Sequence, residues 1–218
     1  MPFFRKLAFC AALSTALAAP AGAVTLGQSS TFEGATTEGW TSGEFNPVQP
    51  SLVTSGGPAG AGDGYLLVTS SGVHGPGGKL LVLNTGDWIG NFLAAGVGGI
   101  EMDLNNLGAT NLSLRLYVEG APGFSALSNT AIELPAGSGW IHASFALSEQ
   151  ALAGAAVATL GGVTRLRLYH GSTAAFPGED IAASLGVDNI TAVPEPGAAL
   201  LMAAGLAALA VRRRACPA

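Results

Sequence analysis

Short segments that alternate between apolar and polar residues dominate the chain between residues 24 and 192. The clearest runs from Leu112 to Glu119. Its odd-numbered positions are Ser113, Arg115, Tyr117 and Glu119, and its even-numbered positions are Leu112, Leu114, Leu116 and Val118. A period of two places these sets on opposite faces of a strand. The segments 140–147 and 164–170 alternate in the same way, and strands are also predicted at 65–70, 79–84, 98–104 and 185–192.

Glycine-rich turns separate these segments, and 32 glycines occur in the whole chain. One short helix is predicted to begin at Ser148, a good capping residue, and to end by Gly161. Asn105–Gly108 is expected to be a turn and Ser55–Gly64 a loop, which lacks the Gly-Lys-Ser/Thr of a phosphate-binding loop. Many half-polar strands with one helix predict an all-β fold, an antiparallel β-sandwich.

The N-terminal residues 1–23 have the pattern of a signal peptide for Sec-type export. Arg5 and Lys6 precede an apolar run at 7–19, and Ala21 and Ala23 provide a small-x-small cleavage site. The mature protein is therefore expected to begin at Val24, with one domain at 24–192.

The C-terminal residues 193–218 form a second targeting pattern. Val193, Pro194, Glu195 and Pro196 precede an apolar run at 198–211, and Arg212, Arg213 and Arg214 follow it. The run predicts a transmembrane helix, although it is shorter than the roughly 20 residues of a usual span. The arginines would lie on the cytoplasmic side. An ordinary membrane anchor is one interpretation.

The order of these features resembles the PEP-CTERM sorting signal of Gram-negative bacteria. That resemblance implies recognition by an exosortase, a membrane-embedded protease of the transpeptidase type. It implies export across the inner membrane, transient membrane anchoring, and then a place at the cell surface or in the medium. It also implies a link to exopolysaccharide and biofilm matrix. The four residues after the arginines, 215–218, depart from the usual pattern.

Charge and cysteine content narrow the classes of function. Both cysteines, Cys10 and Cys216, lie in the targeting segments, so the domain cannot form disulfides. Residues 24–192 contain thirteen acidic residues and four basic ones, a net charge of −9. A nucleic-acid-binding protein would show the opposite balance.

Three short motifs give the domain a second resemblance, to carbohydrate-binding-module jelly rolls of the galactose-binding-like type. They are Phe32-Glu33, the segment Gly62–Tyr65, and Val187–Ile190. The resemblance implies a structural calcium bound by Glu33 and Asp188, with Asp63 as a further candidate ligand. The alternative is that Glu33 caps a turn and Asp188 is solvated.

Two strands share the order Arg-Leu-Tyr, which predicts a face for sugar binding. Arg115 with Tyr117, and Arg167 with Tyr169, would line that face if the strands belong to one sheet. Aromatic rings stack on sugar rings, and guanidinium groups donate to hydroxyl and carboxylate oxygens. Trp88 is a candidate second platform, or alternatively a plug at one end of the sandwich.

No catalytic residue is predicted. His74, His142 and His170 are isolated and lack the spacing of a zinc site. Glu101 and Asp103 share a strand face, which suits either a glycosidase pair or a solvated surface. The first hypothesis for function is a non-enzymatic cell-surface or matrix protein, the second a carbohydrate-binding module holding matrix polysaccharide, and the third a secreted glycan hydrolase.

Overall fold

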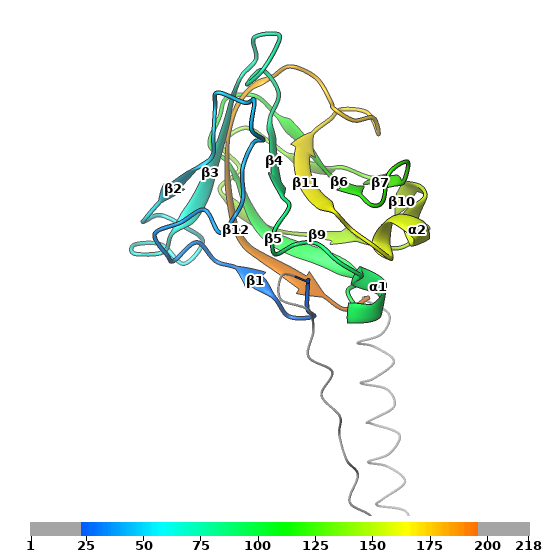
Figure 1. Ribbon diagram of the computed structural model, residues 1–218. Coiled ribbons are helices and arrows are strands. Elements are labelled where there is room, and N and C mark those ends of the chain that lie inside the picture. Colours follow the sequence, from blue (N-terminus) through cyan, green and yellow to red (C-terminus); the bar gives the residue numbers. More distant parts are fainter. Residues whose placement is uncertain (1–22, 196–218) are drawn as a thin grey trace, which may run out of the picture.

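The computed structural model describes residues 23–195, which form two six-stranded sheets packed face to face (Figure 1). The first sheet has the order β2-β3-β12-β5-β9, and β1 pairs with β12. The second has the order β10-β7-β6-β11-β4, and β8 pairs with β6. Every pairing between these strands is antiparallel, as predicted.

Seven of the twelve strands in the described residues correspond to the predicted segments, and the other five, each of four residues or fewer, were not predicted. The first sheet contains β1 (Ser29–Ser30), β2 (Ser51–Val53), β3 (Tyr65–Ser71), β5 (Gly99–Asn106), β9 (Trp140–Ala146) and β12 (Ala182–Val193). The second contains β4 (Leu81–Asn84), β6 (Leu112–Glu119), β7 (Ser125–Ser128), β8 (Ile132–Leu134), β10 (Leu152–Gly154) and β11 (Arg165–His170).

The core lies between the sheets and is made by the apolar positions of the strands. Leu112, Leu114, Leu116 and Val118 of β6 are all buried, as their alternation predicts. Leu66, Met102 and Val187 of the first sheet are fully buried opposite them. Burial of each such side chain contributes roughly 1.5–3 kcal/mol to the stability of the folded state. This packing stabilises a domain that cannot form disulfides.

The helical prediction was wrong in its bounds. Ser148 lies in a turn, β10 follows it, and the helix α2 is confined to Ala156–Leu160. A second helix, α1 (Phe92–Ala95), was not predicted. Asn91 caps it by accepting a hydrogen bond from Ala94 N at 2.8 Å. The turn predicted at Asn105–Gly108 begins later than expected, because β5 continues to Asn106 and only Leu107 and Gly108 lie beyond it.

The last strand, β12, lies in the middle of its sheet. It pairs with β3 along one edge, and with β5 along the other up to the pair Val193–Gly99. Its register with β5 shifts between Asp188 and Thr191, where Asn189 has a φ of 51°. This bulge bends the strand and changes which side chains it buries.

Within residues 23–195, no helix has the length and apolar character needed to cross a membrane. The predicted transmembrane helix at 198–211, Pro196 and the three arginines lie outside the described residues. So does the predicted signal peptide, except for Ala23.

Candidate functional site

The predicted sugar face lies on the outer side of the second sheet, where β6 and β11 are neighbours. Tyr117 is opposite Arg167 in the register, and Arg115 is opposite Tyr169. The structure therefore brings these four residues together, as the shared Arg-Leu-Tyr order predicted.

Half of this face is covered and unavailable to a ligand. Tyr169 is 0% exposed and Arg115 only 7%. The guanidinium of Arg115 donates to the carbonyl oxygens of Gly171, Ser128 and Asn129, at 2.8–2.9 Å. Burial raises the pKa of Tyr169, against the lowering effect of nearby Arg115. The prediction that Arg115 and Tyr169 contact sugar is corrected, because both are part of the protein interior.

The covering residue is Phe176, in the segment between β11 and β12. Its ring is parallel to that of Tyr117, with centroids 4.2 Å apart, and meets Tyr169 edge-on at 5.4 Å. Arg167 lies over both Phe176 and Tyr117, at 4.9 Å and 5.6 Å from the ring centroids. Aromatic and cation–π contacts of this kind fix the segment onto the sheet.

The prediction that Trp88 is a second platform for sugar is also corrected, because Trp88 is only 1% exposed. Its ring centroid lies 6.0 Å from that of Trp40, and both indole N–H groups donate to Ser30 Oγ, at 3.1 Å and 3.2 Å. The interpretation of Trp88 as a plug of the sandwich agrees with this burial.

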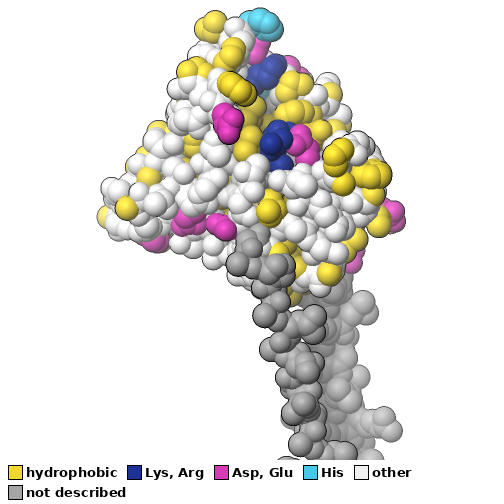
Figure 2. Space-filling model, viewed as in Figure 1, with side chains coloured by type: hydrophobic (Ala, Val, Ile, Leu, Met, Phe, Trp, Pro, Cys, Tyr) yellow, Lys and Arg dark blue, Asp and Glu magenta, His cyan; other side chains and the backbone are white. Residues whose placement is uncertain are grey.

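An open cleft of about 350 Å³ lies beside the covered area, along the outer edge of β4, where Leu83 pairs with Thr41. Leu81 and Leu83 line it together with Arg167 and Phe176 of the face just described. The segments 42–46 and 75–77 form its other walls, and Phe45 is 89% exposed. Figure 2 shows hydrophobic and basic side chains gathered on this face of the molecule.

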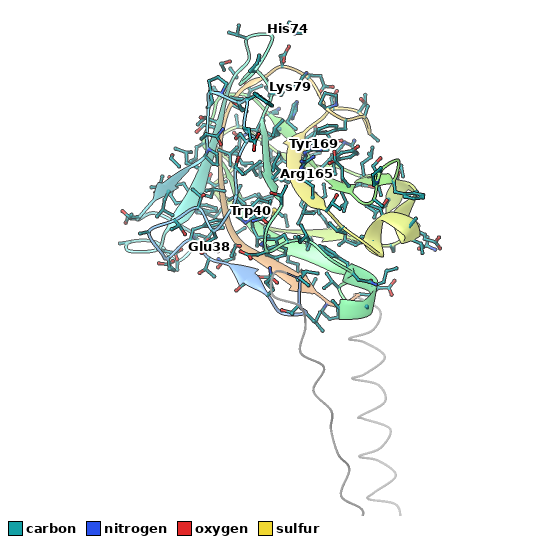
Figure 3. The ribbon with its side chains drawn as sticks, in the orientation of Figure 1. Glu38, Trp40, His74, Lys79, Arg165 and Tyr169 are labelled. Atoms are coloured by element: carbon teal, nitrogen blue, oxygen red, sulfur yellow. The ribbon has the colours of Figure 1, made fainter. Side chains whose placement is uncertain are left out.

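The two cations of the cleft already have acidic partners. Arg167 Nη1 pairs with Glu119, which also binds Arg165 at 2.6 Å. Lys79 Nζ donates to Gly178 O at 2.6 Å and lies 3.4 Å from Asp180 Oδ1. His74 hydrogen-bonds to the same Asp180 carboxylate and lowers its pKa. Figure 3 shows His74 and Lys79 at the end of the molecule opposite Glu38 and Trp40.

Such a cleft has the parts needed to hold a sugar ring. An exposed aromatic ring and aliphatic side chains offer an apolar surface, and Asn46, Ser42 and Arg167 offer polar groups. Sequence reasoning missed Phe45 and Phe176 because both lie in turns. A lone aromatic residue in the turn-rich segment Gly43–Pro47 was the available signal.

The three candidate calcium ligands are separated in sequence, and their carboxylates influence one another. Asp188 is 0% exposed, and its Oδ1 accepts from Asn189 N at 2.7 Å. Its Oδ2 is buried without a hydrogen-bond partner. Burial raises the pKa of Asp188 to about 7, and the negative charges of Asp63, Asp103 and Glu33 add to that effect.

Glu33 and Asp63 are held by the loop at 55–64. Glu33 Oε1 accepts from Gly64 N at 3.1 Å, and Asp63 Oδ2 accepts from Ala59 N at 2.6 Å. In the described part of the chain, no three Asp, Glu, His or Cys side chains converge into a ready metal cluster. A calcium ion, which takes six to eight oxygen ligands, would need backbone carbonyls as well. The unpartnered Oδ2 of Asp188 is available as one of the oxygen ligands.

Glu101 and Asp103 lie on the outer face of the first sheet, and His142 contacts both. His142 Nδ1 is 2.9 Å from Asp103, and Nε2 is 3.5 Å from Glu101. The hydrogen bond with Asp103 raises the pKa of His142. Asn189 Nδ2 donates to the other oxygen of Asp103 at 2.8 Å. Both carboxylates thus have polar partners from neighbouring strands.

Residues 192–214 match the family described as the PEP-CTERM protein-sorting motif. The motif indicates a protein that is exported and sorted to the cell envelope, and implies an exosortase as the processing enzyme. It covers only the end of the chain. No curated protein matches the sequence.

Solved structures share the fold at low sequence identity. A family 11 carbohydrate-binding module from Clostridium thermocellum, in complex with a mixed-linked beta-1,3-1,4-tetrasaccharide, is 14% identical with a TM-score of 0.51. The alignment covers 78% of this chain and 98% of that module. An exo-beta-agarase is 16% identical with a TM-score of 0.57, and the alignment covers 76% of this chain but only 24% of the agarase. The predicted jelly-roll sandwich is confirmed by these likenesses.

Proposed function

We propose that this chain is an exported, non-enzymatic protein of the cell surface or extracellular matrix, which binds matrix polysaccharide and is processed by an exosortase in a Gram-negative bacterium. One observation carries the proposal. A sandwich with the fold of carbohydrate-binding modules has an aromatic-rimmed cleft and continues directly into a sorting motif.

The cleft beside β4 is the proposed glycan site, in place of the face that the sequence suggested. Phe45 provides the exposed ring, Arg167 and Asn46 provide donors, and Phe176 and Leu81 complete the apolar surface. Tyr117 supports Phe176 from below. A binding role needs no catalytic pair, and an exported module of this kind would hold the polysaccharide that surrounds the cell.

Affinity electrophoresis of the full chain, in native gels cast with the host's exopolysaccharide and a mild detergent, tests this site. We expect retardation that Phe45→Ala weakens about threefold or more, since aromatic contacts contribute roughly 0.5–1.5 kcal/mol beyond area burial. Phe124→Ala is the matched control, because Phe124 is exposed and lies outside the cleft.

Unretarded wild-type protein would count against glycan binding, and equal effects of the two substitutions would count against this cleft. Release of soluble sugars from the glycan would instead support the hydrolase hypothesis.

We also propose that a structural calcium ion is bound by Glu33 and Asp188, with Asp63 as a further ligand. The buried, unpartnered Oδ2 of Asp188 supports this, because a cation there would stabilise the charged carboxylate. The carboxylates of Glu33 and Asp63 both raise the pKa of Asp188. When bound, calcium would tie the start of the domain to its central strand.

Thermal unfolding with and without a chelator tests the calcium proposal. We expect the chelator to lower Tm and added calcium to restore it, because a ligand that binds only the folded state stabilises it. Elemental analysis should find about one calcium per chain. An unchanged Tm together with calcium-free protein would overturn the proposal. Glycan retardation is measured separately for the chelator-treated and the calcium-loaded protein, so that the calcium and glycan proposals are tested independently.

A further inference from the structure

The sorting motif does not begin beyond the folded domain but inside it. Residues 192–214 match the motif, and β12 extends to Val193. Ala192 N donates to Gln28 O at 2.9 Å, and Gly98 N donates to Val193 O at 2.9 Å. The first two residues of the motif are therefore strand residues that pair with β5, and Ala192 is also bonded to Gln28, just before β1.

The next two residues, the half-buried Pro194 and the exposed Glu195, form part of the wall of a groove between the two short helices. The groove has a volume of about 440 Å³, and its walls include Leu93 of α1 and Val157 and Leu160 of α2. Leu93 and Val157 are both exposed apolar side chains, and Val97 below them is buried. Pro194 and Glu195 contribute to the lining of the same groove.

Gly98 is the residue that makes room for this segment. A Cβ added to Gly98 would lie 2.4 Å from the backbone nitrogen of Glu195, 2.5 Å from its Cα and 2.6 Å from its Cβ. The three nearest atoms thus all belong to Glu195, and the φ of Gly98 is not in the left-handed region. A glycine is therefore needed at position 98 to leave space for Glu195, and not to allow an unusual backbone conformation.

We propose that Gly98 and the adjoining wall of the groove form a seat on which Pro194 and Glu195 pack, and that this segment must leave the seat before the processing enzyme can bind the motif. This inference rests on the proposed processing by an exosortase. Proteolytic enzymes act on chain that has opened locally, and a paired strand end opens only part of the time. The stability of the seat therefore limits the rate of processing.

Two variants of the full chain remove the seat by different routes. Gly98→Val fills the space that Glu195 occupies. Insertion of Gly-Ser-Gly-Val after Val193 moves the intact Val-Pro-Glu-Pro sequence away from the groove and leaves Gly98 unchanged. Gly162→Ala is the matched control, since Gly162 follows α2 and a Cβ there meets no atom within 4 Å.

Pulse-chase labelling in cells that express the host's exosortase measures the rate of processing. We expect both seat variants to be processed several-fold faster than the wild type, and Gly162→Ala at the wild-type rate. Unchanged or slower processing of both seat variants would overturn the proposal.

Hydrogen exchange of the unprocessed full chain tests the seat without the enzyme. We expect slow exchange at the residue-98 amide in the wild type and several-fold faster exchange in both seat variants. The Leu147 amide, which donates to Gly98 O at 2.9 Å, should change little. Fast exchange at Gly98 in the wild type would overturn the seat. If the wild type is never processed, the sorting function fails, and the exchange result still decides on the seat.

Discussion

At the scale of one residue, the buried carboxyl group of Asp188 lowers the stability of the folded domain when it is charged. It is buried on the central strand, one oxygen has no partner, and three acidic residues act on it. Its pKa of about 7 in the folded protein lies above the usual value of 3.8. Between those two values the folded state holds more protons than the unfolded state, so this group lowers stability as pH rises.

Asp188→Asn should remove that dependence. In the presence of a chelator, we expect the wild type to lose stability between about pH 4 and pH 7, by an amount on the order of 2–4 kcal/mol for this group. The asparagine variant should lose less over the same range. Urea unfolding at several pH values measures the difference. Parallel pH profiles for the two proteins would show that Asp188 is not the group responsible.

Calcium should affect the two proteins differently. A bound cation favours the charged carboxylate, so saturating calcium should flatten the wild-type profile through this pH range. The Asp188→Asn variant should respond little, because it has lost one proposed ligand.

At the scale of elements, the segment between β11 and β12 decides which part of the second sheet is accessible. Phe176 covers Tyr169 and stacks on Tyr117. Lys79 and Ser172 help hold the segment, through Gly178 O and the Glu179 carboxylate. The same segment provides one wall of the cleft, so its packing and the proposed binding site depend on each other.

Gly178→Ala tests that dependence. An added Cβ would lie 2.0 Å from His170 O, and the φ of 76° is also unfavourable for alanine. We expect a lower Tm, proteolytic cleavage within 171–181 and weaker glycan retardation. Gly137→Ala is the control, because its φ is 63° but a Cβ there meets no atom within 4 Å. Equal losses in both variants would mean that only backbone strain matters, at a cost of about 1–3 kcal/mol.

The same segment explains what the sequence could and could not predict. Alternation correctly placed Arg115, Tyr117, Arg167 and Tyr169 on the outer face of neighbouring strands, and it predicted the long strands well. It carries no information about whether another segment covers that face. Phe176 and Phe45 come from turns, where no period links a residue to a face. The short strands β1, β7 and β10 have too few residues for a detectable pattern.

For the whole molecule, the distribution of charge favours a neutral ligand. Residues 24–192 carry a net charge of −9, and the two cations of the cleft are each bound to an acidic residue. A polyanion would have to displace those partners and approach an acidic protein, which costs free energy at low salt.

We therefore expect binding to a neutral glycan to change little as salt is raised to about 0.5 M, where exposed charges are strongly screened. Retardation in gels at several salt concentrations measures this. A steep loss of retardation with salt would indicate instead that the ligand is anionic and that Lys79 and Arg167 exchange partners on binding.

The central position of β12 has a mechanical consequence. Tension between a polysaccharide in the cleft and an anchor at the tail would enter the first sheet through its middle strand, β12, and a pull along the axis of that strand would load both of its neighbours. The hydrogen bonds to β3 and β5 run across that axis, so they would be loaded in shear and resist together. A tail attached to an edge hairpin would break its hydrogen bonds one at a time, whereas a load on β12 would be shared among its bonds to β3 and β5.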